Sequence, residues 1–144
     1  MGIPDLFFMK VVKIDKLLPT PGYTTKGAGG LDLYSRLDVE ITPKNPTFIP
    51  LNVIIEIPEG YVGLLIARSS LARNKGLALV NGIGVIDSDF TGPEDEIQAE
   101  VITVGDMTAY VNRGDKIAQL LIVPTLYVGG QPTVELVDVI GKKN

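Results

Sequence analysis

The chain has 144 residues, 17 acidic against 13 basic side chains, a formal net charge of -4, and neither cysteine nor histidine. This length can bury a core of one domain, and the net negative charge gives no broad basic surface for nucleic acid. Without cysteine or histidine there can be no disulfide, thiol nucleophile, Ser-His-Asp triad or usual transition-metal site, so acid–base chemistry falls to Asp, Glu, Lys, Tyr or water.

The N-terminal sequence shows no targeting or membrane segment. No apolar run approaches the length of a membrane span, and residues 6–9 are too short for a signal peptide and lack a basic segment before them. We therefore predict a cytoplasmic protein with no membrane partner. No linker or internal repeat interrupts the chain, which predicts a single domain over residues 1–144 with an irregular leader at 1–8.

Short apolar segments separated by turn residues dominate the chain, and none of them has helical periodicity. Such a pattern predicts an all-β sandwich or barrel. The expected strands are residues 9–14, 31–35, 39–41, 48–57, 62–66, 77–80, 83–86, 96–103, 117–123 and, after a turn at 129–130, 134–140.

A polar, glycine-rich loop at 24–30 precedes the strand that carries Asp32. Asp32 lies between two leucines, so its side chain faces away from theirs. Two interpretations stay open at this point: an exposed strand residue, or a carboxylate placed beside a ligand.

Residues 67–76 are the one predicted helix. A serine can cap the start of a helix, and Gly76 is a natural stop. The helix start would present backbone N–H groups, the hydroxyls of Ser69 and Ser70, and Arg68, which together suit an anion. The alternative is a capped surface turn.

The dipeptide Asn81-Gly82 between two apolar runs predicts a tight hairpin, because both residues tolerate a positive φ. The second run leads to Asp87, followed by a second carboxylate and an aromatic ring. The pattern is compatible with a solvated turn, or with a nucleoside pocket that has a catalytic carboxylate at its edge.

Gln119 lies in the predicted strand 117–123, which Pro124 ends. By alternation its side chain shares a face with Ile117 and Leu121, and an amide on a largely apolar face needs a hydrogen-bonding partner. The preceding turn carries two cations, Arg113 and Lys116.

Four segments, residues 28–35, 68–72, 84–92 and 114–120, together resemble the first four signature motifs of the trimeric dUTP pyrophosphatases (dUTPases). The resemblance implies a jelly-roll-like distorted β-barrel with one short helix, and a homotrimer whose sites are each built from more than one subunit. It also implies Mg²⁺-dependent hydrolysis of dUTP to dUMP and pyrophosphate. The Mg²⁺ would be held by substrate phosphates and water, with no direct protein ligand.

The resemblance also implies roles for individual residues. Asp87 would activate the water that attacks the α-phosphorus, and Phe90 would pack on the deoxyribose and disfavour a 2′-hydroxyl. The uracil would be read by Asn81 and by the hairpin backbone, including Gly84 and Ile86. The remaining substrate-binding positions are Arg68, Ser69, Ser70 and Gln119 at the phosphates, and Asp32, which helps to order the site.

The chain departs from the family pattern mainly in residues 125–144, an arm without the Gly-Phe-Gly-rich fifth motif. Phe90 stands where tyrosine is commoner, and Ala67 replaces a usual proline. Two alternatives follow. Arg73 and Glu100 suggest a dCTP deaminase or a bifunctional deaminase and dUTPase, although Glu100 also fits a solvent-facing strand residue. The missing fifth motif suggests a non-catalytic nucleotide-binding protein of the same fold.

Overall fold

The computed structural model describes residues 8–125 and 131–141. Most of the expected leader and the turn at 129–130 lie outside this part of the chain. The described elements are β1 (Val11–Lys13), β2 (Leu31–Tyr34), β3 (Val39–Ile41), β4 (Thr47–Pro50), β5 (Val53–Ile55), β6 (Tyr61–Ala67), α1 (Leu71–Lys75), β7 (Leu77–Leu79), β8 (Gly84–Ile86), β9 (Gln98–Thr103), β10 (Ala109–Val111) and β11 (Lys116–Pro124).

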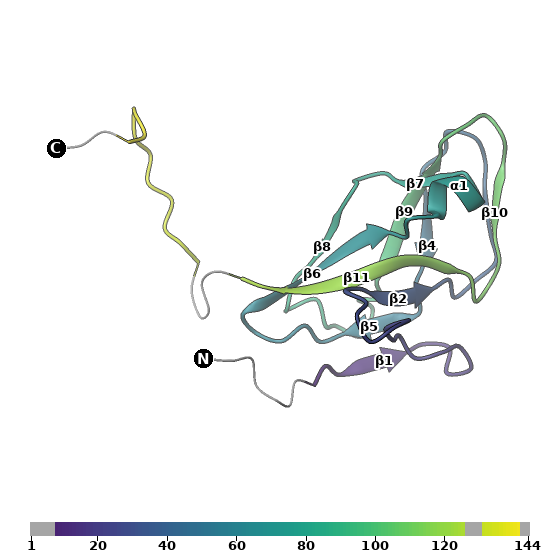
Figure 1. Ribbon diagram of the computed structural model, residues 1–144, viewed down its shortest axis with the longest axis horizontal. Helices are drawn as coiled ribbons and strands as arrows, with labels where there is room; N and C mark the ends of the chain where they lie inside the picture. The colour runs from purple at the N-terminus through teal and green to yellow at the C-terminus, as the bar shows by residue number, and fades with distance from the viewer. Residues whose placement is uncertain (1–7, 126–130, 142–144) are drawn as a thin grey trace.

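The strands form small antiparallel sheets around the long strand β11. The largest sheet has the order β2-β11-β6-β8, and a second has the order β4-β9-β7. β1 pairs with β5, and β10 pairs with β3. Figure 1 shows β11 running between β6 and β2, with α1 at the end of the molecule near β7 and β10. The predicted nearly all-β fold with one short helix is confirmed.

The sheets enclose one cluster of buried apolar side chains. In β9 the inward residues Ala99, Val101 and Thr103 alternate with more exposed ones, as expected for a strand with one buried face. Removal of these apolar side chains from water is the main favourable term in the stability of the fold. The largest fully buried side chains are Leu33, Ile41, Ile49, Leu51, Ile55, Ile57, Leu77, Ile97, Ile117 and Leu120.

The single strand expected over residues 48–57 is wrong, because the chain turns at Asn52 between β4 and β5. Asn52 has a φ of 74°, a left-handed conformation that asparagine tolerates better than most residues. It is 2% exposed. Its Oδ1 accepts a hydrogen bond from the backbone N–H of Asp15 at 2.6 Å, and its Nδ2 donates to the carbonyl of Asp15 at 3.0 Å.

The helix is confirmed, but its predicted serine cap is wrong. α1 ends at Gly76, which has a φ of 68° and donates its N–H to the carbonyl of Ala72. Ser70 occupies the N-cap position without a side-chain capping hydrogen bond. The helix is also too short to make its N-terminus an anion site on its own.

The expected strand over residues 134–140 is wrong as well. The described part of this segment is extended, pairs with no other described strand and points away from the sheets (Figure 1). Val134, Leu136 and Ile140 are 94%, 97% and 92% exposed. Alternation of apolar and polar residues makes a segment compatible with a strand, but a strand needs a hydrogen-bonded neighbour.

We expect Asn52→Ala to lower the stability of the protein by about 2–3 kcal/mol, because alanine loses two partly buried hydrogen bonds and disfavours a positive φ. Asn52→Gly should cost less, because glycine adopts the same φ without strain. The measurement is thermal unfolding at a fixed protein concentration, with Asn45→Ala as control, because the side chain of Asn45 makes an exposed hydrogen bond to Thr42. Equal melting temperatures for Asn52→Ala and Asn45→Ala would contradict this account of the turn.

Candidate active site

A β-bulge in β11 determines which side chains face the candidate site. Lys116 pairs with Tyr34 and Ala118 with Leu33, so β11 advances two residues where β2 advances one. Ile117 is the extra residue. As a result Lys116 and Gln119, three positions apart, project from the same face, opposite Tyr34 and Asp32.

The bulge corrects one detail of the predicted strand. Ile117 is fully buried, as are Ala118 and Leu120, whereas Gln119 and Leu121 are only partly buried. Gln119 therefore shares its face with Leu121 but not with Ile117. A two-residue alternation holds only when the strand has no inserted residue.

Asp32 is buried, so the interpretation as an exposed strand residue is wrong. It is 7% exposed and accepts a hydrogen bond from the hydroxyl of Thr24. Its Oδ1 lies 3.6 Å from Nε of Arg68, and its Oδ2 lies 3.5 Å from Nζ of Lys116. We call Thr24, Asp32, Arg68, Lys116 and Gln119 the Asp32 cluster.

The side chain of Gln119 lies against the backbone of Gly30. A Cβ atom built on Gly30 would overlap Oε1 of Gln119 and lie 3.0 Å from its Cβ. Only a residue without a side chain leaves the amide of Gln119 in this position. At the neighbouring Gly29 an added Cβ would meet no atom within 4 Å.

A further ion pair holds the turn before β11. Nζ of Lys75 lies 2.7 Å from Oδ2 of Asp115, which also accepts a hydrogen bond from the backbone N–H of Asn112. Partial burial raises the pKa of the Asp115 carboxyl, but the hydrogen bonds from Lys75 and Asn112 outweigh it and hold the pKa below its usual value. Asp115 therefore stays ionised and anchors α1 to the start of β11.

The tight hairpin expected around Asn81-Gly82 is wrong, although the turn exists. The N–H of Gly82 bonds to the carbonyl of Leu79 at 3.3 Å, and Gly82 has a φ of 71°. β7 then pairs with β9, whereas β8 pairs with β6. The two strands diverge because each finds its hydrogen bonds in a different sheet.

A small hollow of about 190 Å³ lies between these diverging strands. It contains the predicted base-reading residues Asn81, Gly84 and Ile86. Glu100 also lines it, from β9, and is half-buried rather than fully exposed. The other lining residues are Phe48, Leu65, Leu79, Val85, Gln98 and Ala99.

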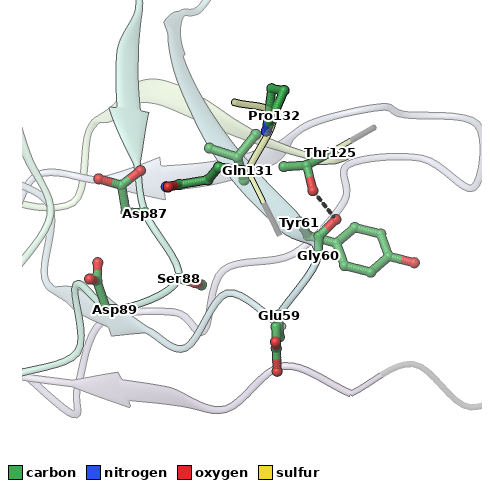
Figure 2. Close-up of a pocket in the computed structure, with 10 residues that line it drawn as sticks. Glu59, Gly60, Tyr61, Asp87, Ser88, Asp89, Thr125, Gln131 and Pro132 are labelled. Atoms are coloured by element: carbon green, nitrogen blue, oxygen red, sulfur yellow. Dashed lines mark hydrogen bonds between the residues drawn. The ribbon is translucent and has the colours of Figure 1, made fainter. Parts of the chain in front are cut away.

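Asp87 lies in a separate, wider groove of about 660 Å³ (Figure 2). Ser88 and Asp89 line it beside Asp87, and the turn before β6 contributes Glu59. Figure 2 shows the side chain of Gln131 pointing toward Asp87. Asp87 is exposed. Phe90 lines neither this groove nor the small hollow and is 37% exposed.

The Asp32 cluster and Asp87 lie at opposite ends of β6. Ile86 pairs with Gly63, so Asp87 follows near the start of β6, whereas Arg68 follows its end together with Ser69 and Ser70. Six residues of extended strand span roughly 20 Å. One chain therefore does not bring these predicted site residues together.

Thr24 and Lys116 were not among the predicted site residues, although the structure places both beside Asp32. Lys116, at the start of β11, is evident in the sequence as a cation, but its face on the strand depends on the bulge. Thr24 gave no signal beyond its place in a polar loop, because its partner Asp32 is reached through the fold.

The described residues contain no group of three or more Asp, Glu, His or Cys side chains that could hold a metal ion directly. Among the acidic residues, Glu59, Asp87 and Asp89 line the groove and Glu100 lines the small hollow. Within the described ranges there is also no helix of the length and hydrophobicity needed to cross a membrane.

A nearly all-β protein with a cationic cluster, a small hollow lined by apolar and polar residues, and an exposed carboxylate has the features of a nucleotide-binding class. A family model described as dUTPase matches residues 17–143. The chain belongs to the dUTPase family.

Three relatives illustrate this membership. The deoxyuridine 5′-triphosphate nucleotidohydrolase of Dictyoglomus turgidum is 41% identical over 116 residues, covering 78% of this chain and 77% of that protein. That of Desulfitobacterium hafniense is 42% identical over 134 residues, covering 91% and 86%. The crystal structure of dUTPase from Streptococcus mutans superposes with a TM-score of 0.75 at 30% identity, covering 83% of this chain and 98% of that one.

We expect Gly30→Ala to displace the Gln119 amide and weaken binding of a non-hydrolysable dUTP analogue about tenfold, the effect of one lost charge-assisted hydrogen bond. Gly29→Ala is the matched control, because the same methyl group meets no neighbour there. Calorimetric titration of both variants measures the difference. Equal affinities would show that Gln119 does not depend on Gly30 for its position.

Proposed function

We propose that this chain hydrolyses dUTP to dUMP and pyrophosphate. Its family membership supports an enzyme of the dUTP diphosphatase class, since its relatives carry that activity in their names. The observation that carries the proposal is that exposed Asp87 directly follows β8, the strand that lines a hollow together with Asn81.

The substrate would divide between these features according to its chemistry. The uracil ring would occupy the small hollow, where the amide of Asn81 and the backbone of Gly84 and Ile86 offer both donors and acceptors. The triphosphate would lie on the Asp32 cluster and the adjoining hydroxyls of Ser69 and Ser70. There the guanidinium of Arg68 supplies a charged, planar set of hydrogen-bond donors, and the amide of Gln119 supplies a neutral donor.

Asp87 would act as the general base. It would accept a proton from water as the water oxygen forms a bond to the α-phosphorus, while the bond from that phosphorus to the α,β-bridging oxygen breaks. The electron pair of that bond leaves with pyrophosphate. A carboxylate is the natural base in a chain without histidine. Phe90 would pack on the deoxyribose and leave no room for a 2′-hydroxyl.

The groove suits hydrated Mg²⁺ better than a directly bound ion. Mg²⁺ keeps several waters and is commonly held through substrate phosphates with one or two carboxylates nearby, and Asp87 and Asp89 are such carboxylates. When bound to the triphosphate, Mg²⁺ would neutralise part of the charge that builds up on the leaving pyrophosphate.

We also propose that the active protein is a homotrimer. The distance of roughly 20 Å along β6 supports this, because a dUTP molecule that contacts both Asp87 and Arg68 would need them from different subunits. A cytoplasmic location stays a prediction.

We expect Asp87→Asn to lower the turnover of dUTP by at least about a thousandfold while binding of the dUTP analogue changes less than tenfold, since the amide keeps the shape but accepts no proton. Chromatography of the products from dUTP and UTP, with and without EDTA, measures turnover, substrate choice and the need for Mg²⁺. Asp106→Asn, at an exposed turn residue, is the control.

Each outcome of this assay decides one point. Unchanged turnover in Asp87→Asn would remove Asp87 from the mechanism. A wild-type protein that binds the analogue but turns over neither nucleotide would support the non-catalytic alternative. Full activity in EDTA would show that hydrolysis does not require Mg²⁺.

A second candidate function is deamination of dCTP, alone or combined with hydrolysis. The observation in its favour is that Glu100 lines the same hollow as Asn81. A carboxylate accepts hydrogen bonds and protons, so it could hold the exocyclic amine of cytosine. It could also take a proton from the water that adds to C4 and return it to the departing ammonia.

If this second activity exists, we expect wild-type protein to release ammonia from dCTP and Glu100→Gln to release at least about a hundredfold less, because the amide cannot transfer the proton. Glu40→Gln, at an exposed position of β3, serves as the control. Release of ammonia is followed by a coupled assay and the nucleotide product by chromatography. Wild-type protein that leaves dCTP unchanged would rule out deamination.

A further inference from the structure

Asn81 is the one asparagine of the chain that is followed by glycine. In this dipeptide the backbone nitrogen of Gly82 can attack Cγ of the Asn81 side chain, because glycine has no side chain to block the approach and its backbone adopts many conformations. The product of the attack is a five-membered ring, a succinimide, and its formation is the first step of deamidation. The turn between β7 and β8 is therefore a candidate site of spontaneous chemical modification.

The fold leaves this dipeptide exposed and weakly restrained. Asn81 and Gly82 are both exposed, and a Cβ built on Gly82 would meet no described atom within 4 Å. The N–H of Gly82 donates to the carbonyl of Leu79 over 3.3 Å, which is long for a backbone hydrogen bond. Among the described residues, no hydrogen bond holds the side-chain amide of Asn81. Neither the attacking nitrogen nor the side chain that it must reach is held firmly.

The divergence of β7 and β8 removes the restraint that a hairpin would impose. In a tight hairpin the ladder between the two strands would fix the conformation of both turn residues. Here the N–H of Ile83 donates to the carbonyl of Asn81 at 2.7 Å, across a φ of 71° at Gly82. This is the pattern of a γ-turn with a positive central φ, which is rare and strained. A strained turn that no ladder closes resists rearrangement less than a paired hairpin would.

We propose that Asn81 deamidates spontaneously in the folded protein, and that loss of its amide weakens nucleotide binding. In the first step the bond from the Gly82 nitrogen to Cγ of Asn81 forms and the bond from Cγ to Nδ2 breaks. Nδ2 leaves as ammonia and takes the proton of the Gly82 N–H. Water then opens the succinimide at either of its carbonyl groups, and the products are aspartate and isoaspartate.

The effect on binding rests on the proposed function, in which Asn81 reads the uracil. An amide offers both a donor and an acceptor, whereas a carboxylate only accepts. Glu100 lines the same hollow, so deamidation would add a second carboxylate to it, and like charges that share a site repel. Isoaspartate also inserts a carbon atom into the backbone, which would shift the residues that follow. Both products should therefore bind the base less tightly.

The first measurement follows the folded full chain over time at mildly alkaline pH, by peptide mapping with mass spectrometry. We expect deamidation at Asn81 to be at least about tenfold faster than at Asn112, whose following residue has a bulky side chain and donates its N–H to Asp38 at 2.7 Å. Exposed Asn45 is the internal control, because the nitrogen of Pro46 has no proton to lose. The chain in denaturant gives the rate without a fold, and we expect the folded rate at Asn81 to lie within about tenfold of it.

The second measurement is calorimetric titration with a non-hydrolysable dUTP analogue. Fully aged wild-type protein, and Asn81→Asp without ageing, should bind the analogue about 10- to 100-fold more weakly than fresh wild-type protein. Asn81→Gln keeps an amide but closes a cyclic imide far more slowly, so whatever affinity it has should not change on ageing. If either variant does not fold, the comparison of fresh with aged wild-type protein still decides the effect on binding.

The outcomes separate this proposal from the proposed function. If Asn81 stays an amide in the folded protein while it deamidates in denaturant, or reacts no faster than Asn112, the modification site is overturned. If Asn81 deamidates but the aged protein binds the analogue like fresh protein, the effect on binding is overturned and the modification site stands. If fresh wild-type protein does not bind the analogue, the proposed function fails, whereas the rates at Asn81 still decide the modification.

Discussion

The position of β11 between β2 and β6 is the constraint on which the rest of the molecule depends. β11 pairs with both neighbours, so its backbone donors and acceptors are satisfied on two sides and its register cannot shift without breaking both ladders. The same strand buries Ala118 and Leu120 in the core and carries Gln119 on its other face. Core packing and the placement of the site are therefore set by one register.

The bulge in β11 and the burial of Asp32 act together. A buried carboxylate is costly unless cations and hydrogen bonds compensate it, and the fold supplies the hydroxyl of Thr24, Arg68 and Lys116 from three different segments. Each of those groups is in turn held by the carboxylate. The arrangement links loop 24–30, the end of β6 and the start of β11 through one buried carboxylate.

Local sequence patterns predicted the elements whose causes are local. The alternation in β9, the stop at Gly76 and the end of β11 at Pro124 were all confirmed, because each follows from propensity or backbone conformation. The predictions were wrong where a residue or strand elsewhere in the chain determines the local structure. Asn52 turns the chain through its bonds to Asp15, and the exposed arm lacks a neighbouring strand among the described residues. The extra residue in β11 has no signature of its own.

The failed hairpin prediction shows why the remaining part of the site could not be predicted locally. Asn81-Gly82 does form a turn, but β7 pairs with β9 and β8 pairs with β6 instead of with each other. A paired hairpin would have closed the space between the two strands, whereas the divergence leaves the hollow that Asn81, Gly84 and Glu100 line. The hollow thus exists because tertiary hydrogen bonds prevail over the local preference for a hairpin. Asn81 lines the hollow from the turn and Glu100 lines it from β9, so a substitution in β9 can change the lining of the hollow without changing the turn that contains Asn81.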